Sequence, residues 1–596
     1  MSPTPDETAQ ITAADDSQPT LPRLFGGRSA WIIAAALVFG TLWFAMQATR
    51  LGLTKQYSID ESQYGHAAWL VSKGEVPYRD FFEHHFALTY QLLALPLLFL
   101  DDNPENIIWL RVCMLAVLFL LGSATWYINA KVDGIAALLA PILALSVWQL
   151  STRATEIRPD AVAFSLFLAA VAVLYLQRTD SRIKGFACGF LLTAALWANQ
   201  KVVYYGCVFG AALVVDILLN RSRRSGYLLG HPLVFLLGCG TVIVPVCVFL
   251  LLTESMDQCF YWCLQWAAFH EWNYPGFSWR DYFDPLLRDY PILFLFCATG
   301  LIRTVYELAR AKDGRWYHPD LILCATFVST FMAYRLLQAP YGYNLIPFIV
   351  LLGIFAARGV TTMVQLAWRM QIVPFRLLAS IVVLSLLVLQ LALGNLRIEE
   401  ELDKDNVYQH EVLAAIGELT APTDSAYDNC GGYFSRPNVH YFFFTNALLR
   451  KTHHDNLAEE IPAAIMNSGC TLYLHDLRFP QLPARLKQFV VTHFQPYNSD
   501  IWLWGQRYEV DRGNGLDAEF YAVRRSKYFV YPTSTLRSGR LTIDGVAIDE
   551  SVFQLEKGPK RVRYQGSPVE FYILWLPRNG KMYQPQHTLT PNFSHL

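Results

Sequence analysis

The feature that most constrains this chain is a series of apolar segments in its first two thirds. Each is close to the length of a membrane-spanning helix, which needs about 20 mainly apolar residues and at least about 17. With 53% hydrophobic and 16% charged residues, the 596-residue chain is also too apolar for an ordinary soluble enzyme. We therefore predict a polytopic α-helical membrane protein with about 11 transmembrane helices. The predicted spans lie near residues 30–48, 107–128, 134–151, 159–177, 184–200, 201–219, 231–252, 291–309, 319–337, 343–360 and 376–395.

Basic residues in the loops predict the orientation of these spans. Residues 88–100 are apolar but too short to cross a bilayer, and they contain Pro96, so we expect them to lie along its surface. The later basic loops then fall on the same side as Arg23 and Arg28, and loops rich in Lys and Arg are cytoplasmic. Residues 1–22 have no basic n-region, so we predict an uncleaved first span. The N-terminus is thus expected in the cytoplasm and the C-terminal region in the periplasm.

Composition divides the chain into four predicted parts. Residues 1–29 form a polar cytoplasmic tail, and residues 30–395 hold all of the predicted spans. Strands alternate with helices over residues 396–514, which indicates a soluble α/β module. Short alternating runs over residues 515–596 indicate a small β-sandwich module. This soluble region has no evident catalytic set, and we favour a role in acceptor binding for it.

Most of the 11 cysteines lie in apolar segments, where cysteine behaves as a small buried hydrophobic residue. They carry no information on redox chemistry. Cys430 and Cys470 differ, because both lie in the region predicted to face an oxidising compartment. A disulfide between them stays open, since connectivity cannot be deduced from sequence alone.

The loop after the first span holds a dense cluster of groups that can accept protons or bind metal. Charged groups beside a bilayer are costly to desolvate, so such a cluster favours a reaction centre. An alternative stays open for the two acids that begin the predicted helix, because acids in a first turn can serve only as helix caps. The members of the cluster are Asp60, Glu61, Glu83, His84 and His85.

The motif D-E-x-x-Y-x-x-x-A, which begins at Asp60, is followed by F-F-E-H-H and resembles the first external loop of the GT-C glycosyltransferases. These membrane enzymes take sugar from a polyprenyl-phosphate carrier. The pattern is most similar to the branch of protein O-mannosyltransferases and aminoarabinose transferases. The resemblance implies a GT-C-like catalytic domain over residues 30–395, a catalytic Asp60, and a second acid at Glu83, where the family has an E-K-P-P-like motif. His84 stands here in place of the lysine of that motif.

A sugar transfer that inverts the anomeric carbon needs a carboxylate to take a proton from the attacking hydroxyl or amine. We predict that Asp60 is this base, with Glu61 and Glu83 as further catalytic residues. The predicted function is transfer of a monosaccharide from a polyprenyl-phosphate donor to a lipid, glycan or protein acceptor. The predicted orientation places this reaction on the periplasmic face of a bacterial inner membrane. The sequence identifies neither the sugar nor the acceptor.

Basic and aromatic residues near the external ends of the spans are candidates for binding the donor. A charge at such depth is expensive unless it is paired, and a phosphate is a natural partner. Snorkelling of the basic residues and an interfacial belt of aromatic residues are alternatives that stay open. The candidates for the donor phosphate and sugar are His84, His85, Arg158, Lys201, Arg280, Tyr341 and Tyr343.

Carboxylate and imidazole groups in the external loops also suit a divalent metal cation. The aminoarabinose branch binds a metal near the motif Glu with a His from a later external loop. That resemblance implies Glu83 and His270 as the metal pair here. Hydrogen-bonded histidines at the membrane surface are the alternative, and no other cofactor is predicted.

Two other classes of function stay open. A lipid or glycan transporter would also have many spans, although transport sites lie near the bilayer midplane rather than at its surface. A non-catalytic cell-envelope assembly protein would account for the soluble region. No basic tract is long enough to indicate a nucleic-acid partner, and no P-loop indicates a nucleotide-driven pump.

Overall fold

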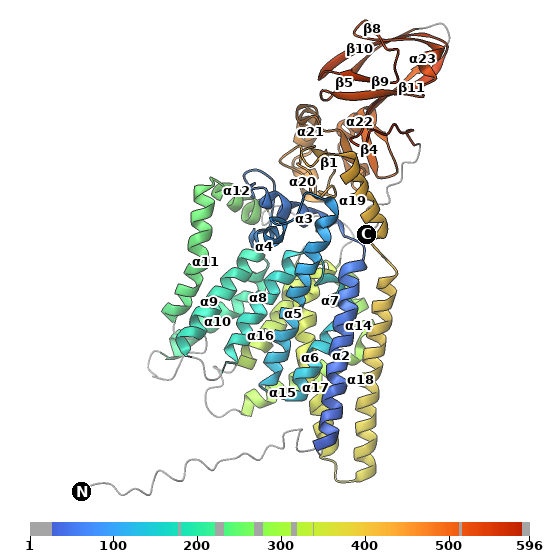
Figure 1. Cartoon of the computed structure of the whole chain (residues 1–596). Helices are drawn as coiled ribbons and strands as arrows, with labels where there is room; N and C mark the ends of the chain where they lie inside the picture. The colour runs from blue at the N-terminus through green and yellow to red at the C-terminus, as the bar shows by residue number, and fades with distance from the viewer. Residues whose placement is uncertain are drawn as a thin grey trace, which may run out of the picture.

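The helices of this protein form an elongated bundle, and the C-terminal region stands on one end of it (Figure 1). We call this end the capped end. The computed structural model describes residues 27–176, 180–220, 232–266, 278–310, 319–337, 339–511 and 515–586.

Each predicted span coincides with a helix of the bundle. The helices are α2 (Gly27–Thr54), α5 (Ile107–Ala130), α6 (Gly134–Leu145), α8 (Pro159–Leu174), α9 (Ser181–Ala198), α10 (Val202–Asn220), α11 (Pro232–Leu252), α15 (Pro291–Arg310), α16 (Pro319–Leu336), α17 (Ile346–Trp368) and α18 (Val373–Leu402). Among the described residues, 6 helices are long and apolar enough to cross a membrane by length and composition. They lie at Trp31–Thr54, Pro104–Ala130, Pro232–Leu252, Pro291–Arg310, Gly342–Trp368 and Val373–Leu402. The chain is a multi-pass membrane protein, while the number and direction of its crossings stay predictions.

The predicted span 134–151 is divided in the structure. Helix α6 ends at Leu145, and the short helix α7 (Trp148–Arg153) follows it. Ser151 Oγ donates to the carbonyl oxygen of Leu145 at 2.6 Å, so a side chain satisfies an acceptor that a continuous helix would have bonded. Apolar length alone does not reveal such a break.

Two short helices, α3 (Ile59–Ser72) and α4 (Leu88–Leu97), lie at the capped end (Figure 1). Helix α3 begins with a capping box, in which Ser58 Oγ accepts from the backbone N of Glu61 at 3.4 Å. The Glu61 carboxylate in turn accepts from the backbone N of Ser58 at 2.9 Å. The ten residues of α4 extend only about 15 Å, which is too short to cross a bilayer.

The C-terminal region contains two β-sheets and several helices. The helices are α19 (Val407–Leu419), α20 (Ala447–Thr452), α21 (His454–Ser468), α22 (Ala484–His493) and α23 (Thr535–Ser538). The strands are β1 (Ala426–Tyr427), β2 (Leu472–Leu474), β3 (Phe494–Pro496), β4 (Ile501–Val510), β5 (Leu516–Ala522), β6 (Ser526–Tyr531), β7 (Gly539–Ile543), β8 (Val546–Ala547), β9 (Val552–Leu555), β10 (Gly558–Gly566) and β11 (Val569–Trp575).

One sheet has 7 strands in the order β1-β2-β4-β11-β6-β9, with β3 paired to β4, and the other has 4 strands in the order β5-β10-β7-β8. The larger sheet takes strands from both predicted soluble modules, because β4 pairs with β2 and with β11. Cys430 and Cys470 are both buried in this region as free thiols.

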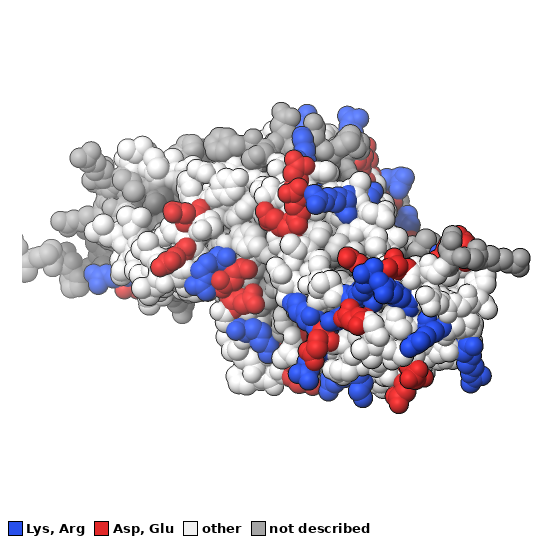
Figure 2. Space-filling view, turned by 90° about the horizontal axis from the view of Figure 1, so that it is seen from above, with Lys and Arg blue, Asp and Glu red and all other residues white. Residues whose placement is uncertain are grey.

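The face that Figure 2 shows, seen from above, carries basic and acidic side chains intermixed over the described residues. Opposite charges that alternate over short distances largely cancel, so neither sign dominates the described residues on this face (Figure 2).

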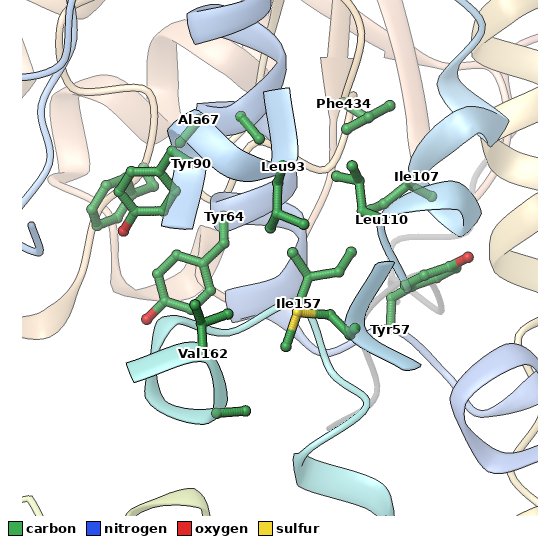
Figure 3. Packing of buried hydrophobic residues seen from close by; sticks show 14 of the residues in the cluster. Tyr57, Tyr64, Ala67, Tyr90, Leu93, Ile107, Leu110, Ile157, Val162 and Phe434 are labelled. Carbon is green, nitrogen blue, oxygen red and sulfur yellow. The ribbon is translucent and has the colours of Figure 1, made fainter. Parts of the chain in front are cut away.

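The C-terminal region packs directly on α3. Phe434 lies beside Ile107 and Leu110 of α5, with Tyr64 and Leu93 from the short helices close by (Figure 3). These side chains form one apolar core that continues from the bundle into the C-terminal region. The position of α3 therefore depends on both parts of the chain.

Helices α15 and α17 cross at two glycines. A Cβ atom at Gly359 would lie 1.8 Å from the carbonyl oxygen of Phe296, and one at Gly300 would lie 1.9 Å from that of Phe355. The backbones touch at this point, which only residues without a side chain permit. Because α17 is almost wholly buried, this crossing fixes the helix that leads into the candidate site.

We expect Gly359→Ala to lower the stability of the bundle by about 1–3 kcal/mol or more, since the new methyl group must displace backbone. Thermal unfolding of the purified protein in detergent, followed by intrinsic tryptophan fluorescence, measures this change. Gly240→Ala in α11 is the matched control, because a Cβ atom there meets nothing within 4 Å. Equal midpoints for the two variants would contradict the close crossing.

Candidate functional site

Four predicted site residues, far apart in the sequence, meet at the capped end of the bundle. Asp60 lies in the first turn of α3, and Arg158 is the N-cap residue of α8. Lys201 lies in the turn between α9 and α10, and Tyr343 lies in the short helix η4 (Gly342–Leu345). Direct contacts among these four residues define the site.

The central contact joins Asp60 and Arg158. Arg158 Nη2 donates to Asp60 Oδ2 at 2.7 Å, while Arg158 Nη1 lies 3.5 Å from Glu156 Oε2. The Arg158 side chain is 1% exposed, whereas that of Asp60 is 33% exposed. Arg158 Nε is buried and has no hydrogen-bond partner among the described residues. Asp60 is therefore a carboxylate that a substrate can reach, held from behind by a buried cation.

Nearby charges set the ionisation of Asp60. Burial alone would raise the pKa of its carboxyl group, but the positive charges of Arg158, Arg478 and Lys201 outweigh burial and hold the pKa below its usual value. Asp60 is consequently ionised at neutral pH. It is ready to accept a proton without first losing one.

The ring of Tyr343 brings two cations together. The Arg158 Cζ atom lies 3.5 Å from the centroid of this ring, and the Lys201 Nζ atom lies 5.0 Å from it. Tyr341 stacks on Tyr343 with ring centroids 5.4 Å apart. Both predicted tyrosines thus line the site beside the cations.

Lys201 also has polar partners that the membrane environment requires. Its Nζ atom lies 3.1 Å from Asp160 Oδ1 and 2.9 Å from Asn344 Oδ1. Asn199 supports this arrangement, because its Nδ2 donates to Asp160 Oδ1 at 3.2 Å and its Oδ1 accepts from the backbone N of Lys201 at 3.0 Å. These contacts hold the lysine side chain in place. It is still accessible, because 25% of the side chain is exposed.

A pocket opens beside Lys201 between α10 and α16. It is polar where Lys201 lies and becomes aromatic and apolar along the two helices. The accessible space inside it is only about 30 Å³, which admits a small polar group. The polar and apolar lining suits a charged head group joined to a hydrocarbon chain. Its lining residues are Asp160, Asn199, Lys201, Tyr204, Tyr205, Thr330, Ala333, Tyr334, Leu337, Tyr343, Asn344 and Pro347.

Glu61 has a different environment from its neighbour Asp60. It is fully buried, and its Oε1 and Oε2 atoms accept from Nε and Nη2 of Arg111, each at 2.8 Å. The backbone N atoms of Ile157 and Ser58 donate to the same carboxylate at 3.1 and 2.9 Å. The catalytic role that we predicted for Glu61 finds no support in this geometry, because both oxygens already hold other parts of the fold in place.

We expect Glu61→Gln to destabilise the protein by about 3–5 kcal/mol, because it leaves the buried Arg111 without a counter-charge. The melting temperature in detergent measures this loss. Asp60→Asn is the matched comparison at the adjacent residue and should lower the melting temperature less, since Glu156 remains as a counter-charge for Arg158. A larger loss for Asp60→Asn would reverse the roles that we assign to the two acids.

Glu83, His84 and His85 form a compact group of buried side chains. Glu83 Oε1 accepts from the backbone N atoms of His84 and His85 at 2.8 and 3.1 Å. One potential ligand atom from each of the three residues lies within 4.8 Å of those of the others. Glu83 Oε2 and His85 Nδ1 are buried without hydrogen-bond partners among the described residues. The donor set fits a divalent cation.

Burial holds the pKa of His85 well below its usual value, so this ring is neutral at physiological pH. Its Nε2 atom lies 3.3 Å from the hydroxyl of Tyr64. A neutral imidazole can bind a metal but cannot balance the charge of a phosphate. This environment favours a ligand or hydrogen-bonding role for His85 over the phosphate contact that we predicted.

Two predicted residues lie apart from this group. His270, the second member of the predicted metal pair, falls outside the described residues. Arg280 begins α14 (Arg280–Asp289), is exposed, and places its guanidinium 5.5 Å from the ring centroid of Trp279. In the described part of the chain, no interaction joins Arg280 to Asp60 or Lys201, and its role in donor binding stays a prediction.

Several residues of the site were not predicted from the sequence. Asp160 and Asn344 bind Lys201, and Glu156 lies beside Arg158. The polar turns that contain them, in otherwise apolar surroundings, were an available signal. Arg478 had none, because it lies in the soluble region and approaches Asp60 only through the fold.

No family model and no curated protein matches the chain. Solved structures do match it. ArnT from Cupriavidus metallidurans in the apo state has a TM-score of 0.52 and 13% sequence identity, covering 80% of this chain and 98% of that chain. The same protein bound to undecaprenyl phosphate gives a TM-score of 0.50 at 12% identity, with the same coverage. The Archaeoglobus fulgidus oligosaccharyltransferase tethered with an acceptor peptide gives 0.50 at 10% identity, covering 80% of this chain and 74% of that chain.

The chain has the GT-C fold. The predicted class, a polytopic helical membrane domain followed by a soluble C-terminal α/β and β-sandwich region, is confirmed. At these low identities the likeness concerns the fold alone. The chemistry of this protein depends on its own residues.

Proposed function

We propose that this protein is an inverting glycosyltransferase that moves a monosaccharide from a polyprenyl-phosphate carrier to an acceptor hydroxyl or amine. The observation that carries the proposal is Asp60, an accessible carboxylate held ionised by the buried Arg158. The pocket beside Lys201 adds to it, because its polar end and apolar sides suit a lipid phosphate. Undecaprenyl phosphate is the ligand bound by one of the proteins that share the fold.

In the proposed reaction, Asp60 accepts the proton of the acceptor as its oxygen or nitrogen attacks the anomeric carbon. The bond between that carbon and the phosphate oxygen breaks, and the carrier leaves as a phosphate anion. Arg158 and Lys201 stabilise the negative charge that develops on this phosphate. Arg158 Nε, which is buried without a partner among the described residues, can donate to it. One carboxylate acting directly on the acceptor inverts the anomeric configuration.

We further propose that Glu83, His84 and His85 hold a divalent cation. When bound, such a cation supplies positive charge that offsets the negative charge of the donor phosphate. The support is the proximity of three buried potential ligands, together with two ligand atoms that have no other partner among the described residues.

The acceptor is a lipid, glycan or protein in this proposal, and the reaction takes place on the periplasmic face of a bacterial inner membrane.

The test is transfer from a panel of labelled polyprenyl-phosphate sugars by purified protein in lipid, with a cell-envelope extract as acceptor. We expect the wild type to pass label to an acceptor, and Asp60→Asn to transfer about 10²–10⁴-fold more slowly, because the base is lost. Glu105→Gln is the control, since Glu105 is a partly exposed acid at the same end of the bundle.

Translocation of a donor without covalent transfer would contradict the proposal and favour a transporter. Transfer by Asp60→Asn at the wild-type rate would remove Asp60 from its role. No transfer from any donor by the wild type would favour the non-catalytic alternative.

A further inference from the structure

The C-terminal region packs on the loop that carries Glu83, His84 and His85. We call residues 428–445 the docking segment, because they include Phe434, Tyr441 and Phe444, which contact α3 and this loop. Tyr441 contributes twice, since its carbonyl oxygen accepts from the backbone N of Phe82 at 2.9 Å and its hydroxyl donates to the carbonyl oxygen of Tyr78 at 2.7 Å. The ring of Phe444 packs on Phe82 with centroids 4.9 Å apart. The loop from Tyr78 to His85 is therefore fixed by the soluble region.

The docking segment also lies against α3, the helix that begins with Asp60. The carbonyl oxygen of Phe434 accepts a hydrogen bond from Nδ1 of the buried His66. Gly431 has a φ of +74°, and a Cβ atom there would lie 2.9 Å from Cβ of His66. Such a close approach requires glycine. The soluble region and the bundle thus form one structure around the site.

Arg478 extends from the loop after β2 toward this junction. Its backbone N donates to Asp476 Oδ1 at 2.7 Å, and its Nη1 donates to the carbonyl oxygen of Asn429 at 2.8 Å. The backbone N of Asn429 donates to Asp476 Oδ2 at 2.9 Å, so the two loops hold each other. The guanidinium of Arg478 is consequently fixed in position before any ligand arrives.

Arg478 differs from the other two cations that act on Asp60, because those two are paired with carboxylates. Arg158 faces Asp60 and Glu156, and Lys201 faces Asp160. Within the described ranges, no carboxylate oxygen lies within the ion-pair distance of 4.0 Å of the Arg478 guanidinium, which is half-buried. Arg478 is nevertheless close enough to Asp60 to lower its pKa, an effect that among the neighbouring charges comes directly after that of Arg158. In the part of the chain that the structure describes, the Arg478 guanidinium thus donates to the carbonyl oxygen of Asn429 but has no carboxylate partner.

We propose that Arg478 is a further substrate-binding residue, which binds an anionic phosphate or carboxylate group of a substrate beside Asp60. This inference rests on the function proposed above. A guanidinium binds such groups through paired hydrogen bonds, and its low hydration favours partly buried sites. The anion is the carrier phosphate of the donor or an acidic group of the acceptor. In either case, the soluble region supplies a residue of the site as well as a cover for it.

The experiment compares Arg478→Gln and Arg478→Lys with the wild type, all purified in lipid nanodiscs. Gln can still donate to the carbonyl oxygen of Asn429, so the fold should remain intact. Arg485→Gln is the control, because Arg485 forms an exposed ion pair with Glu459 in the same region. The measurements are binding of undecaprenyl phosphate and of uncharged undecaprenol, the KM of donor and acceptor in the transfer assay, and the melting temperature.

We expect Arg478→Gln to weaken either the binding of undecaprenyl phosphate or the binding of the acceptor by about 10- to 100-fold. Arg478→Lys should recover part of this loss, and the melting temperature of both variants should be unchanged. If the anion is the carrier phosphate, binding of undecaprenyl phosphate weakens and that of undecaprenol does not. If the anion belongs to the acceptor, only the acceptor KM rises.

Unchanged binding and unchanged KM values in Arg478→Gln would overturn the inference. An equal loss for undecaprenyl phosphate and undecaprenol, or a loss that follows a lower melting temperature, would also overturn it. In both cases transfer by the wild type would leave the proposed function standing. A wild type that neither binds the carrier nor transfers sugar would refute both proposals together.

Discussion

The ion pair between Asp60 and Arg158 is the interaction on which the rest of the site depends. A guanidinium that is 1% exposed at the end of a helix bundle must be paired, because an uncompensated buried charge costs about 3–5 kcal/mol. Asp60, Glu156 and Tyr343 together meet this requirement, and they come from three separate parts of the chain. Pairing Arg158 therefore brings together the start of α3, the start of α8 and the turn before α17.

The same pair gives Asp60 its chemical character. The carboxylate lies on the open side of the pair, so it is partly solvated, while its counter-charge is not. In the proposed reaction, a substrate would meet an ionised acid whose orientation is already fixed by Arg158, so the acid would need little reorganisation. The docking segment packs on α3 from the soluble region, and the positive charge of Arg478 acts on Asp60 as well. If Arg478 binds substrate as proposed, the bundle and the soluble region share the site.

Much of this fold could be predicted from the sequence, because a membrane span has a minimum apolar length and a strand has a period of two. Each predicted span overlaps a helix for that reason, although the span 134–151 is divided between two. The break between α6 and α7 could not be predicted, since it depends on hydroxyl contacts such as that of Ser151. The sheet that joins the two predicted soluble modules could not be predicted either, because its paired strands β4 and β11 are far apart in the chain.

The site was predictable in its location but not in its roles. Asp60 and Glu61 are equivalent in sequence, yet successive residues on a helix point in different directions, and only Glu61 faces Arg111. The adjacent His84 and His85 would be poor joint ligands on a regular element, but here they lie in an irregular segment and approach Glu83 together. Arg478 gave no local signal, because its position beside Asp60 arises from the docking of two domains.

The measurement that tests the central claim most directly is the pH dependence of kcat/KM for sugar transfer to a hydroxyl acceptor. The base must be ionised, so the rate falls as the pH falls through the pKa of Asp60, which its neighbours hold below the ordinary 3.8. The account predicts a constant rate from about pH 5 to 8 and a loss only below about pH 4. A loss centred between about pH 6 and 7 would contradict it, because the base would then be a histidine or a carboxyl group with a raised pKa. The charged and titratable groups that act on Asp60 are Tyr64, Arg158, Lys201, Tyr343 and Arg478.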